Sequence, residues 1–483
     1  MSAGPNDVMT GASTPVPAGP DVSRADGSRR ALAIAAGIVA MAVVWIVAAD
    51  HAPHARGALA IFTLMIVFWL TEVVPHAVTG LIGCYLFWAL GVTDFATAFG
   101  GFASPTPWFL FAALLFGDLA SDSGLARRLA QKILRATAGS YSRALFGFVL
   151  VTFVLSLIVP SGLARVAILS TAGLALMNAY GAAAGSNIAR GVFLVLTFTA
   201  LIWDKAMIAG AGAILARGLI EKGGGGPVYW SHWFLAFLPL SLASLIVFWQ
   251  VTLALHPPET SVATARDVEP DEARLPWSAG ERKCAVLLLV LIGLWMTDFL
   301  HHVRPETVAI GLALAAFLPG IGALSGEHIR RFNFTPVLFA GAALSLGGVL
   351  MQTGAVDWLA RVMFAWMAPF TESLPLLTTG VYWTGVAYHL LMPNAQAMLS
   401  TSLPALLEFA AAEKLSPLAL GMIWTFASGP SLMLYQSGII ILGYSYGHFT
   451  ARDFLRYGLI LTIIEFVLLL ALVTIYWPFL GLV

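Results

Sequence analysis

The chain has little charge and almost no cysteine. Only 10% of its 483 residues are Asp, Glu, Lys or Arg, whereas 59% are hydrophobic, a balance that water-soluble domains do not have. The 25 basic and 25 acidic residues cancel, so nothing indicates a nucleic-acid partner. The two cysteines, Cys84 and Cys284, stand far apart in apolar segments. This composition excludes a disulfide scaffold and a cysteine-rich metal site.

The motifs of common hydrolases are missing as well. The sequence has no His-Glu-x-x-His, no Gly-x-Ser-x-Gly and no group of His or Cys at metal-ligand spacing. We therefore expect no enzymatic activity and no bound cofactor.

Long apolar runs fill most of the chain. Runs of about 18 to 22 residues are long enough to cross a hydrocarbon core of ~30 Å as helices. They predict an all-α polytopic membrane protein whose surroundings are the lipid bilayer. Residues 1–30 are instead rich in Gly, Ser and Pro, which predicts a disordered tail. Arg29 and Arg30 precede the first run and place this tail in the cytoplasm.

Several short motifs occur twice in the same order. Each copy leads to a long apolar hairpin that is interrupted at a proline, about residues 145–177 and 374–412. The paired motifs are Trp69-Leu70-Thr71-Glu72 with Trp295-Met296-Thr297-Asp298, Thr106-Pro107 with Thr335-Pro336, Gly124 with Gly354, and Pro160-Ser161-Gly162 with Pro393-Asn394-Ala395. This order predicts two homologous halves.

The two hairpins differ in their basic flanks. Five basic residues precede the first hairpin, and Arg361 alone lies in the matching stretch of the second. The five are Arg127, Arg128, Lys132, Arg135 and Arg143. By the positive-inside rule the first hairpin enters from the cytoplasm and the second from the opposite face. Inverted repeats with broken segments at membrane depth are typical of secondary transporters.

These patterns divide the chain into four parts. After the tail come the first helix and first inverted repeat, residues 31–256, a cytoplasmic linker at 257–283, and the second inverted repeat at 284–483. Further interruptions are expected near Trp203-Asp204-Lys205 and Gly429-Pro430. About 11 transmembrane helices and two re-entrant hairpins put the C-terminus in the periplasm.

Four motifs together resemble the divalent anion:sodium symporter family, whose members carry dicarboxylates, citrate or sulfate. The resemblance extends from about Ala58 to the C-terminus. The motifs are Trp69-Leu70-Thr71-Glu72-Val73-Val74-Pro75, Gly124-Leu125-x-Arg127-Arg128, Leu344-Ser345-Leu346-Gly347-Gly348 with Thr353-Gly354, and Ser437-Gly438 with Asp453-Phe454-Leu455 and Gly458. The resemblance implies a homodimer in the bacterial inner membrane that moves a transport domain like an elevator.

The chain departs from this family at the hairpin tips. Family members carry Ser-Asn-Thr there, next to sodium sites; here Gly162 and Leu163 follow Ser161, and Ala395 and Gln396 follow Asn394. The sequence therefore leaves three alternatives for the coupling of transport: sodium bound near Ser161 and Asn394, protons, or exchange.

Helix breaks inside a membrane expose backbone N–H groups, which suit an anion. We expect the substrate at these breaks, held by the hydroxyl and amide of the two tip residues. The predicted first-half contacts are Ser161, Gly162, Arg165 and Lys205, and the second-half contacts are Asn394, Ala395, Gln396, Tyr435, Gln436 and Ser437. The alternative is that the two prolines only kink packed helices.

Charged residues inside the apolar spans are costly, so each needs a partner or a function. Lys205 either pairs with Asp204 or supplies positive charge near a former sodium site. Arg165 either does the same or extends its side chain to the interface. Asp118 is a coupling residue or bonds a helix end, and a histidine such as His389 is expected to be hydrogen-bonded inside the bundle.

Two functions fit these features. The first is a secondary active transporter of a small anion, a dicarboxylate, sulfate or sulfonate. The second is the membrane subunit of a multicomponent, TRAP-like importer that receives its substrate from a soluble binding protein.

Overall fold

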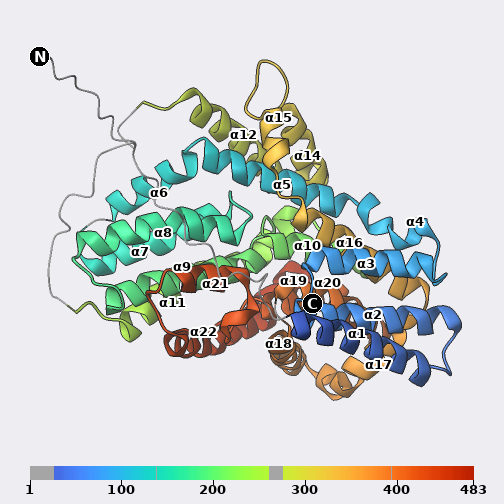
Figure 1. Ribbon diagram of the computed structural model, residues 1–483. Helices are drawn as coiled ribbons and strands as arrows, with labels where there is room; N and C mark the ends of the chain where they lie inside the picture. The colour runs from blue at the N-terminus through green and yellow to red at the C-terminus, as the bar shows by residue number, and fades with distance from the viewer. Residues whose placement is uncertain (1–26, 138, 260–275, 393) are drawn as a thin grey trace, which may run out of the picture.

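The computed structural model describes residues 27–137, 139–259, 276–392 and 394–483, and within these ranges it contains helices and no strand (Figure 1). The helices before the linker are α1 (Gly27–Val47), α2 (Pro53–Thr71), α3 (His76–Ala89), α4 (Phe95–Ala98), η2 (Gly100–Ala103), α5 (Pro105–Asp122), α6 (Leu125–Ala136), α7 (Tyr141–Ser156), α8 (Gly162–Ala179), α9 (Asn187–Ala206), α10 (Ala211–Ile220), η3 (Glu221–Gly225) and α11 (Trp230–Leu255). The predicted tail up to residue 26, most of the linker and Pro393 lie outside the described residues.

The helices after the linker repeat the order of the first half. They are α12 (Ala279–Met296), α13 (Asp298–His301), α14 (Pro305–Ala315), α15 (Gly326–Arg331), α16 (Thr335–Gln352), α17 (Ala355–Phe364), η5 (Ala365–Glu372), α18 (Leu374–Leu391), α19 (Ala395–Ala412), α20 (Pro417–Ala427), η6 (Leu434–Gln436), α21 (Gly438–Ser445), α22 (Ala451–Ala471), η7 (Leu472–Tyr476) and α23 (Trp477–Leu480). In both halves a long helix, a short helix, a hairpin, a broken helix and a last long helix follow one another.

Matching residues of the two halves play matching roles. The buried indoles of Trp69 and Trp295 each donate to a carbonyl at the start of the next helix, at 3.1 and 3.0 Å. Gly124 and Gly354 each begin a short helix with a φ of 82° and 71°, a conformation that costs a residue with a side chain about 1 kcal/mol or more. The double motifs of the sequence therefore mark equivalent structural positions.

Helix pairs occupy the ranges of both predicted hairpins. The helices α7 and α8 pack together on either side of the tip at 157–161, and α18 and α19, which also contact each other, occupy 374–412. Serine and asparagine stand at the N-caps after the two tips, where their side chains accept a backbone N–H.

The broken helix of the first half lies at the centre of the molecule. The run Asn187–Gly225 is apolar, and an 18-residue stretch of it is completely buried, as expected of a helix that is hydrophobic on all sides. The helix α9 packs against α7, α8, α11 and α21, whereas α10 packs against α5, α19 and α20. The predicted position of the break was wrong: Trp203, Asp204 and Lys205 are still helical, and the break follows at 207–210.

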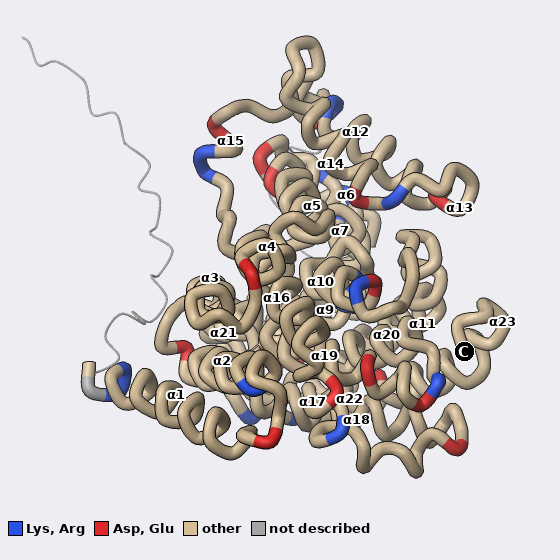
Figure 2. Tube along the Cα trace, turned by 90° about the vertical axis from the view of Figure 1, so that its right-hand side faces the viewer, with Lys and Arg blue, Asp and Glu red and all other residues tan. Residues whose placement is uncertain are grey.

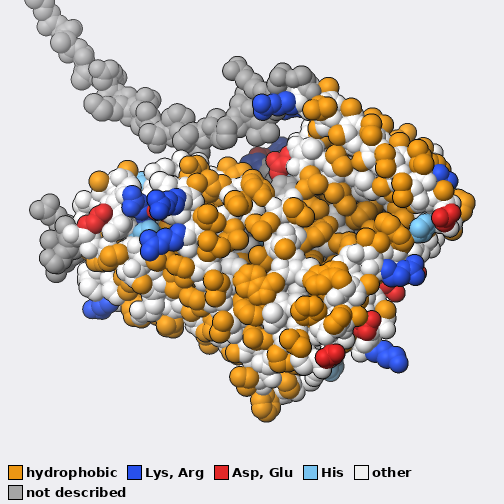
Figure 3. All heavy atoms as spheres, turned by 90° about the horizontal axis from the view of Figure 1, so that it is seen from below, with side chains coloured by type: hydrophobic (Ala, Val, Ile, Leu, Met, Phe, Trp, Pro, Cys, Tyr) orange, Lys and Arg blue, Asp and Glu red, His pale blue; other side chains and the backbone are white. Residues whose placement is uncertain are grey.

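The outer surface is that of a membrane protein. Among the described residues, six helices are long and apolar enough to cross a bilayer, or seven if α5 and α6, which meet at 63°, form one bent span. The exposed face in Figure 3 is covered with hydrophobic side chains, and most charged residues in Figure 2 lie near helix ends. The remaining spans of the predicted eleven are shorter helices, so that number stays a prediction.

Candidate functional site

Both hairpin tips use their polar residue as a helix cap. The Ser161 hydroxyl accepts the N–H of Ala164 at 3.2 Å, and Asn394 Oδ1 accepts the N–H of Ala397 at 2.7 Å. A hydroxyl that accepts one bond still has its own proton to donate, and an amide that accepts through oxygen keeps both N–H groups. The caps therefore leave uncharged donors at the N-terminal ends of α8 and α19.

The segment between α20 and α21 contacts the tips of both hairpins. On the first tip, a side chain added to Gly162 would collide with Ile439 at the start of α21. On the second, the Tyr435 hydroxyl donates to Leu390 O at 2.5 Å and Gln436 Nε2 donates to His389 O at 3.1 Å. Residues that are distant in the sequence thus meet at one place, through the broken helix of the second half.

Lys205 and Asp204 form a buried ion pair at the end of α9. Lys205 Nζ lies 2.5 Å from Asp204 Oδ2, which also accepts the N–H of Gly212 at 3.2 Å, and each of the two side chains is buried. The stem of Lys205 lies against Gly429, at the break of the second half. The pairing that sequence analysis offered as the structural alternative is therefore present, and it lies where the two broken helices meet.

Arg165 is fully buried, so of the two alternatives given for it, the one in which its side chain extends to the membrane interface does not hold. Its guanidinium donates to Val159 O at 3.2 Å and to Ala200 O at 2.8 Å, which joins the first hairpin tip to α9. Its Nε has no hydrogen-bond partner among the described groups, although it is buried. Asp204 interacts with Arg165 electrostatically. Burial inside the bundle is favoured over the interface because two backbone carbonyls, one in the interrupted tip and one on α9, lie within reach of the guanidinium.

The second break presents Gln436 and His389. Gln436 is buried, and its Oε1 accepts the N–H groups of Leu432 and Met433 at 2.7 and 2.6 Å. His389 Nδ1 lies 3.3 Å from Pro430 O, which confirms the expected hydrogen bond inside the bundle. Its Nε2 is buried without a partner, and Lys205 interacts with the ring electrostatically.

The remaining predicted site residues differ in their exposure and in their hydrogen bonds. Tyr435 is half exposed, and the Ser437 hydroxyl caps α21 by accepting the N–H of Ile439 at 3.2 Å. Asn394, Ala395 and Gln396 are partly exposed, and within the described chain no hydrogen bond joins them to Lys205 or Arg165. The structure brings Arg165, Asp204, Lys205, His389 and Gln436 together most closely.

Asp118 does not join this centre. It is exposed on α5, and the groups that act on it electrostatically are Asp122, His328 and Arg331 at the end of that helix and on α15. Its neighbour Gly117 nevertheless packs against Pro160, where a side chain would come within 3.0 Å of the ring. Asp118 as a coupling residue stays a prediction.

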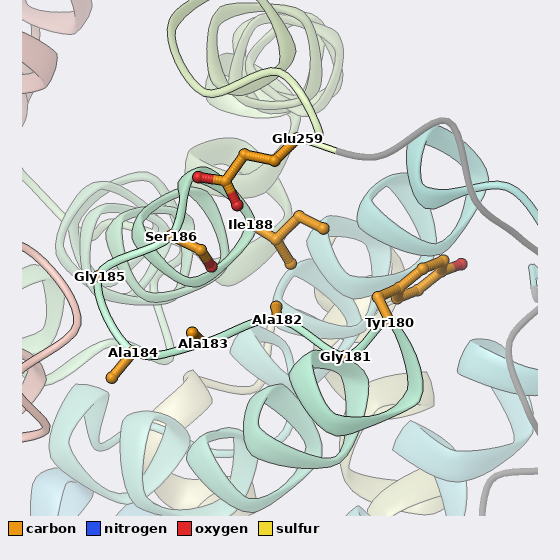
Figure 4. A pocket seen from close by; sticks show the side chains of 9 residues that line it. All are labelled: Tyr180, Gly181, Ala182, Ala183, Ala184, Gly185, Ser186, Ile188 and Glu259. Atoms are coloured by element: carbon orange, nitrogen blue, oxygen red, sulfur yellow. The ribbon is translucent and has the colours of Figure 1, made fainter.

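A separate hollow of about 400 Å³ lies at the base of the first hairpin, between α8 and α9 (Figure 4). Small residues and backbone line most of it, and the one charged side chain is Glu259, which accepts the N–H of Asn187 at 2.9 Å. A carboxylate repels an anion, so this hollow does not suit an anionic substrate. Across the described ranges no group of three or more His, Cys, Asp or Glu could hold a metal ion.

Comparison with known proteins decides the family. The transmembrane region of the sodium:sulfate symporters matches residues 28–483. The chain belongs to this family. It is a multi-pass membrane transporter rather than an enzyme, as the motifs predicted.

Individual relatives agree over nearly their whole length. A membrane protein of Cupriavidus necator is 27% identical over 88% of this chain and 87% of its own. The citrate/succinate antiporter of Escherichia coli K12 is 23% identical over 92% of this chain and 96% of its own, and the L-tartrate/succinate antiporter of the same strain is 23% identical over 86% and 91%. The crystal structure of the Alcanivorax borkumensis YdaH transporter, 17% identical, shares the fold with a TM-score of 0.57 over 82% of this chain and 89% of that one.

Proposed function

We propose that this family member carries a small organic dianion of the dicarboxylate class across the bacterial inner membrane by secondary transport. The observation that carries the proposal is the charge balance where the two broken helices meet. Arg165 and Lys205 are two buried cations, and Asp204 is the one buried carboxylate that interacts with them there. One positive charge is left over, and the capped ends of α8, α19 and α21 add partial positive charge and N–H groups.

The named relatives support a dicarboxylate as substrate. Two of them exchange succinate for citrate or tartrate, according to their names, and they align with the chain over most of its length. A dicarboxylate also fits two sets of uncharged donors, one at Ser161 and one at Asn394, better than a compact anion would.

The fixed cations take a place that sodium would otherwise occupy. Backbone carbonyls freed by helix breaks are the usual ligands of coupling ions in such transporters. Here the guanidinium of Arg165 already bonds Val159 O in the interrupted tip, and it also bonds Ala200 O within α9. We therefore infer that transport does not depend on sodium and that it includes the exchange of one dianion for another. The repeated order of elements supports two inverted halves, and an elevator movement in a homodimer follows from the family.

The test uses purified protein in liposomes loaded with succinate. Uptake of labelled succinate is expected without sodium and without any other protein. Dependence on sodium would contradict the role given to Arg165 and Lys205. If the protein alone shows no uptake and a soluble binding protein restores it, the result would favour the multicomponent importer.

Replacing Lys205 by Met keeps the length of the side chain but removes its charge. Asp204 is then left buried without its cation, which costs about 3–5 kcal/mol, and the site loses its net positive charge. We expect Lys205→Met to abolish exchange. The matched control is Lys132→Met on the exposed face of α6, which should exchange like the wild type. Normal exchange by Lys205→Met would exclude a role for this charge.

A further inference from the structure

A second acidic residue lies deep in the membrane, far from the helix ends. Glu465 is at the midpoint of the apolar span Ala451–Leu480, and its side chain is completely buried. Its hydrogen-bond partner, Ser244, lies close to the midpoint of the span Trp230–Leu255. A charged residue at such a depth costs about 2.5–3.5 kcal/mol even on the mildest scales.

Glu465 differs from the other buried acids because, within the described chain, it has neither a counter-charge nor several hydrogen-bond donors. Asp204 pairs with Lys205, Glu281 with Arg128 and Glu306 with Arg217. Asp298 accepts three hydrogen bonds, from the Trp230 N–H, the Ser231 N–H and the Ser231 hydroxyl. No described cation forms an ion pair with Glu465, and Ser244 alone is hydrogen-bonded to it in the described chain. Four of these five acids are built to be ionised, and Glu465 is not.

The local geometry fits a carboxylic acid. Both oxygens of Glu465 lie near Ser244 Oγ, at 2.9 and 3.1 Å. A serine has one proton to donate, so it satisfies one oxygen of a carboxylate and leaves the other without a donor. An acid can accept the serine proton through one oxygen or donate its own through the other. The titratable groups that act on Glu465 are the uncharged phenols of Tyr382 on α18 and Tyr457 on α22, while α11 contributes the serine.

The helix α18 connects this acid with the candidate site. The Tyr382 hydroxyl donates to Thr462 O at 2.9 Å, one turn before Glu465 on α22. His389 follows Tyr382 by seven residues, which places both on the same buried face of α18, about 10 Å apart along the helix. His389 in turn contacts the break at Pro430 and interacts with Lys205. Packing along α18 thus links the surroundings of Glu465 to the break in the second half.

We propose that Glu465 is a proton-binding site and that its proton is the coupling ion of this transporter. The carboxylate takes up a proton from water when the surrounding helices open, becomes an acid bonded to Ser244, and releases the proton on the other side as the carboxylate forms again. In the present conformation the Glu465 side chain is completely buried, so a proton bound to it is separated from the water on both sides of the membrane. The proposal rests on the transport function proposed above, and it adds a driving ion to it.

The test separates exchange from accumulation in liposomes that contain the full chain. Exchange is measured with succinate on both sides at one pH, and accumulation is measured with succinate outside and a proton gradient directed inward. Glu465→Gln has the shape and hydrogen bonds of the protonated acid, so it should fold and exchange like the wild type. We expect it to lose accumulation to the level of protein-free liposomes.

A measurement without transport complements this test. The difference between infrared spectra in acidic and alkaline buffer should contain the carbonyl band of a buried carboxylic acid in the wild type and lack it in Glu465→Gln. Ser231→Ala, beside the hydrogen-bonded Asp298, is the matched control and should retain the band. Accumulation by Glu465→Gln, an unchanged band, or wild-type exchange without any response to the proton gradient would overturn the proton site. Absence of exchange in the folded wild type would instead refute the proposed function.

Discussion

The packing around the Asp204–Lys205 pair depends on a single neighbouring residue, Gly212. Asp204 and Lys205 fit against α10 because Gly212 has no side chain. A methyl group there would lie 2.5 Å from Lys205 Nζ and 2.8 Å from Asp204 Oδ2. The ion pair depends on this glycine as much as on its own two charges, and no charge pattern in the sequence announces that dependence.

Gly212→Ala should therefore push the ammonium away from its carboxylate. Overpacking of this kind costs about 1–3 kcal/mol, and we expect a lower melting temperature together with strongly reduced succinate exchange. Gly293→Ala on α12 is the control, because nothing lies within 4 Å of its new methyl group and alanine favours a helix. Equal behaviour of the two variants would show that the pair tolerates displacement.

Helix ends carry the contacts that hold separate elements together. Glu281 caps α12 by accepting the N–H of Ser278 at 2.7 Å, and it pairs with Arg128 of α6 at 2.5 Å. It precedes the apolar part of α12, and the hydrogen bond from Arg128 lowers the pKa of the Glu281 carboxyl below its ordinary value of 4.5. The basic helix before the first hairpin is thus fastened to the second half of the chain by one carboxylate.

Because the folded pKa of Glu281 is lowered, its stabilisation is present above the ordinary value and disappears as the pH falls toward the lowered one. Glu281→Gln should melt earlier at neutral pH, by about 1.5–3 kcal/mol of unfolding free energy. The difference in melting temperature between the wild type and Glu281→Gln should disappear at acidic pH. Thermal unfolding at several pH values measures this difference. Glu327→Gln, in an exposed pair with Arg330, should change little at any pH.

At the scale of the whole molecule, the two halves repeat their order of elements, and the sequence predicts that they cross the membrane in opposite directions. Paired positions such as Trp69 and Trp295 make similar hydrogen bonds, and the repeat itself stays a prediction. The direction of each half relative to a bilayer is predicted from the unequal basic flanks.

Single cysteines at the two hairpin bases test that direction. Arg143 is exposed in the first turn of α7, and Glu372 is exposed just before α18. The native Cys84 and Cys284 are buried and should react little. With a membrane-impermeant maleimide, Arg143→Cys should be labelled from the cytoplasmic side and Glu372→Cys from the periplasmic side. Labelling of both from one side would disprove inverted halves.

Much of the architecture could be predicted because it depends on local and periodic signals. Apolar runs predicted the membrane class, which the family match confirms. Paired motifs, with the serine and asparagine before α8 and α19, predicted a repeat and two hairpins, and these stay predictions. The break after α9 was placed too early, since Asp204 and Lys205 looked like interruptions. They remain helical because each neutralises the other and Gly212 donates to the carboxylate.

The sequence was enough to predict a membrane transporter, because bilayer thickness and helix geometry act on every segment separately, whereas its two related halves stay a prediction. The tertiary structure alone decided which carbonyls Arg165 occupies, that Lys205 lies beside Gly429, and that Glu465 meets a lone serine. Those contacts join residues far apart in the chain. Their energies depend on which groups packing brings within a few ångströms, and no local pattern records that.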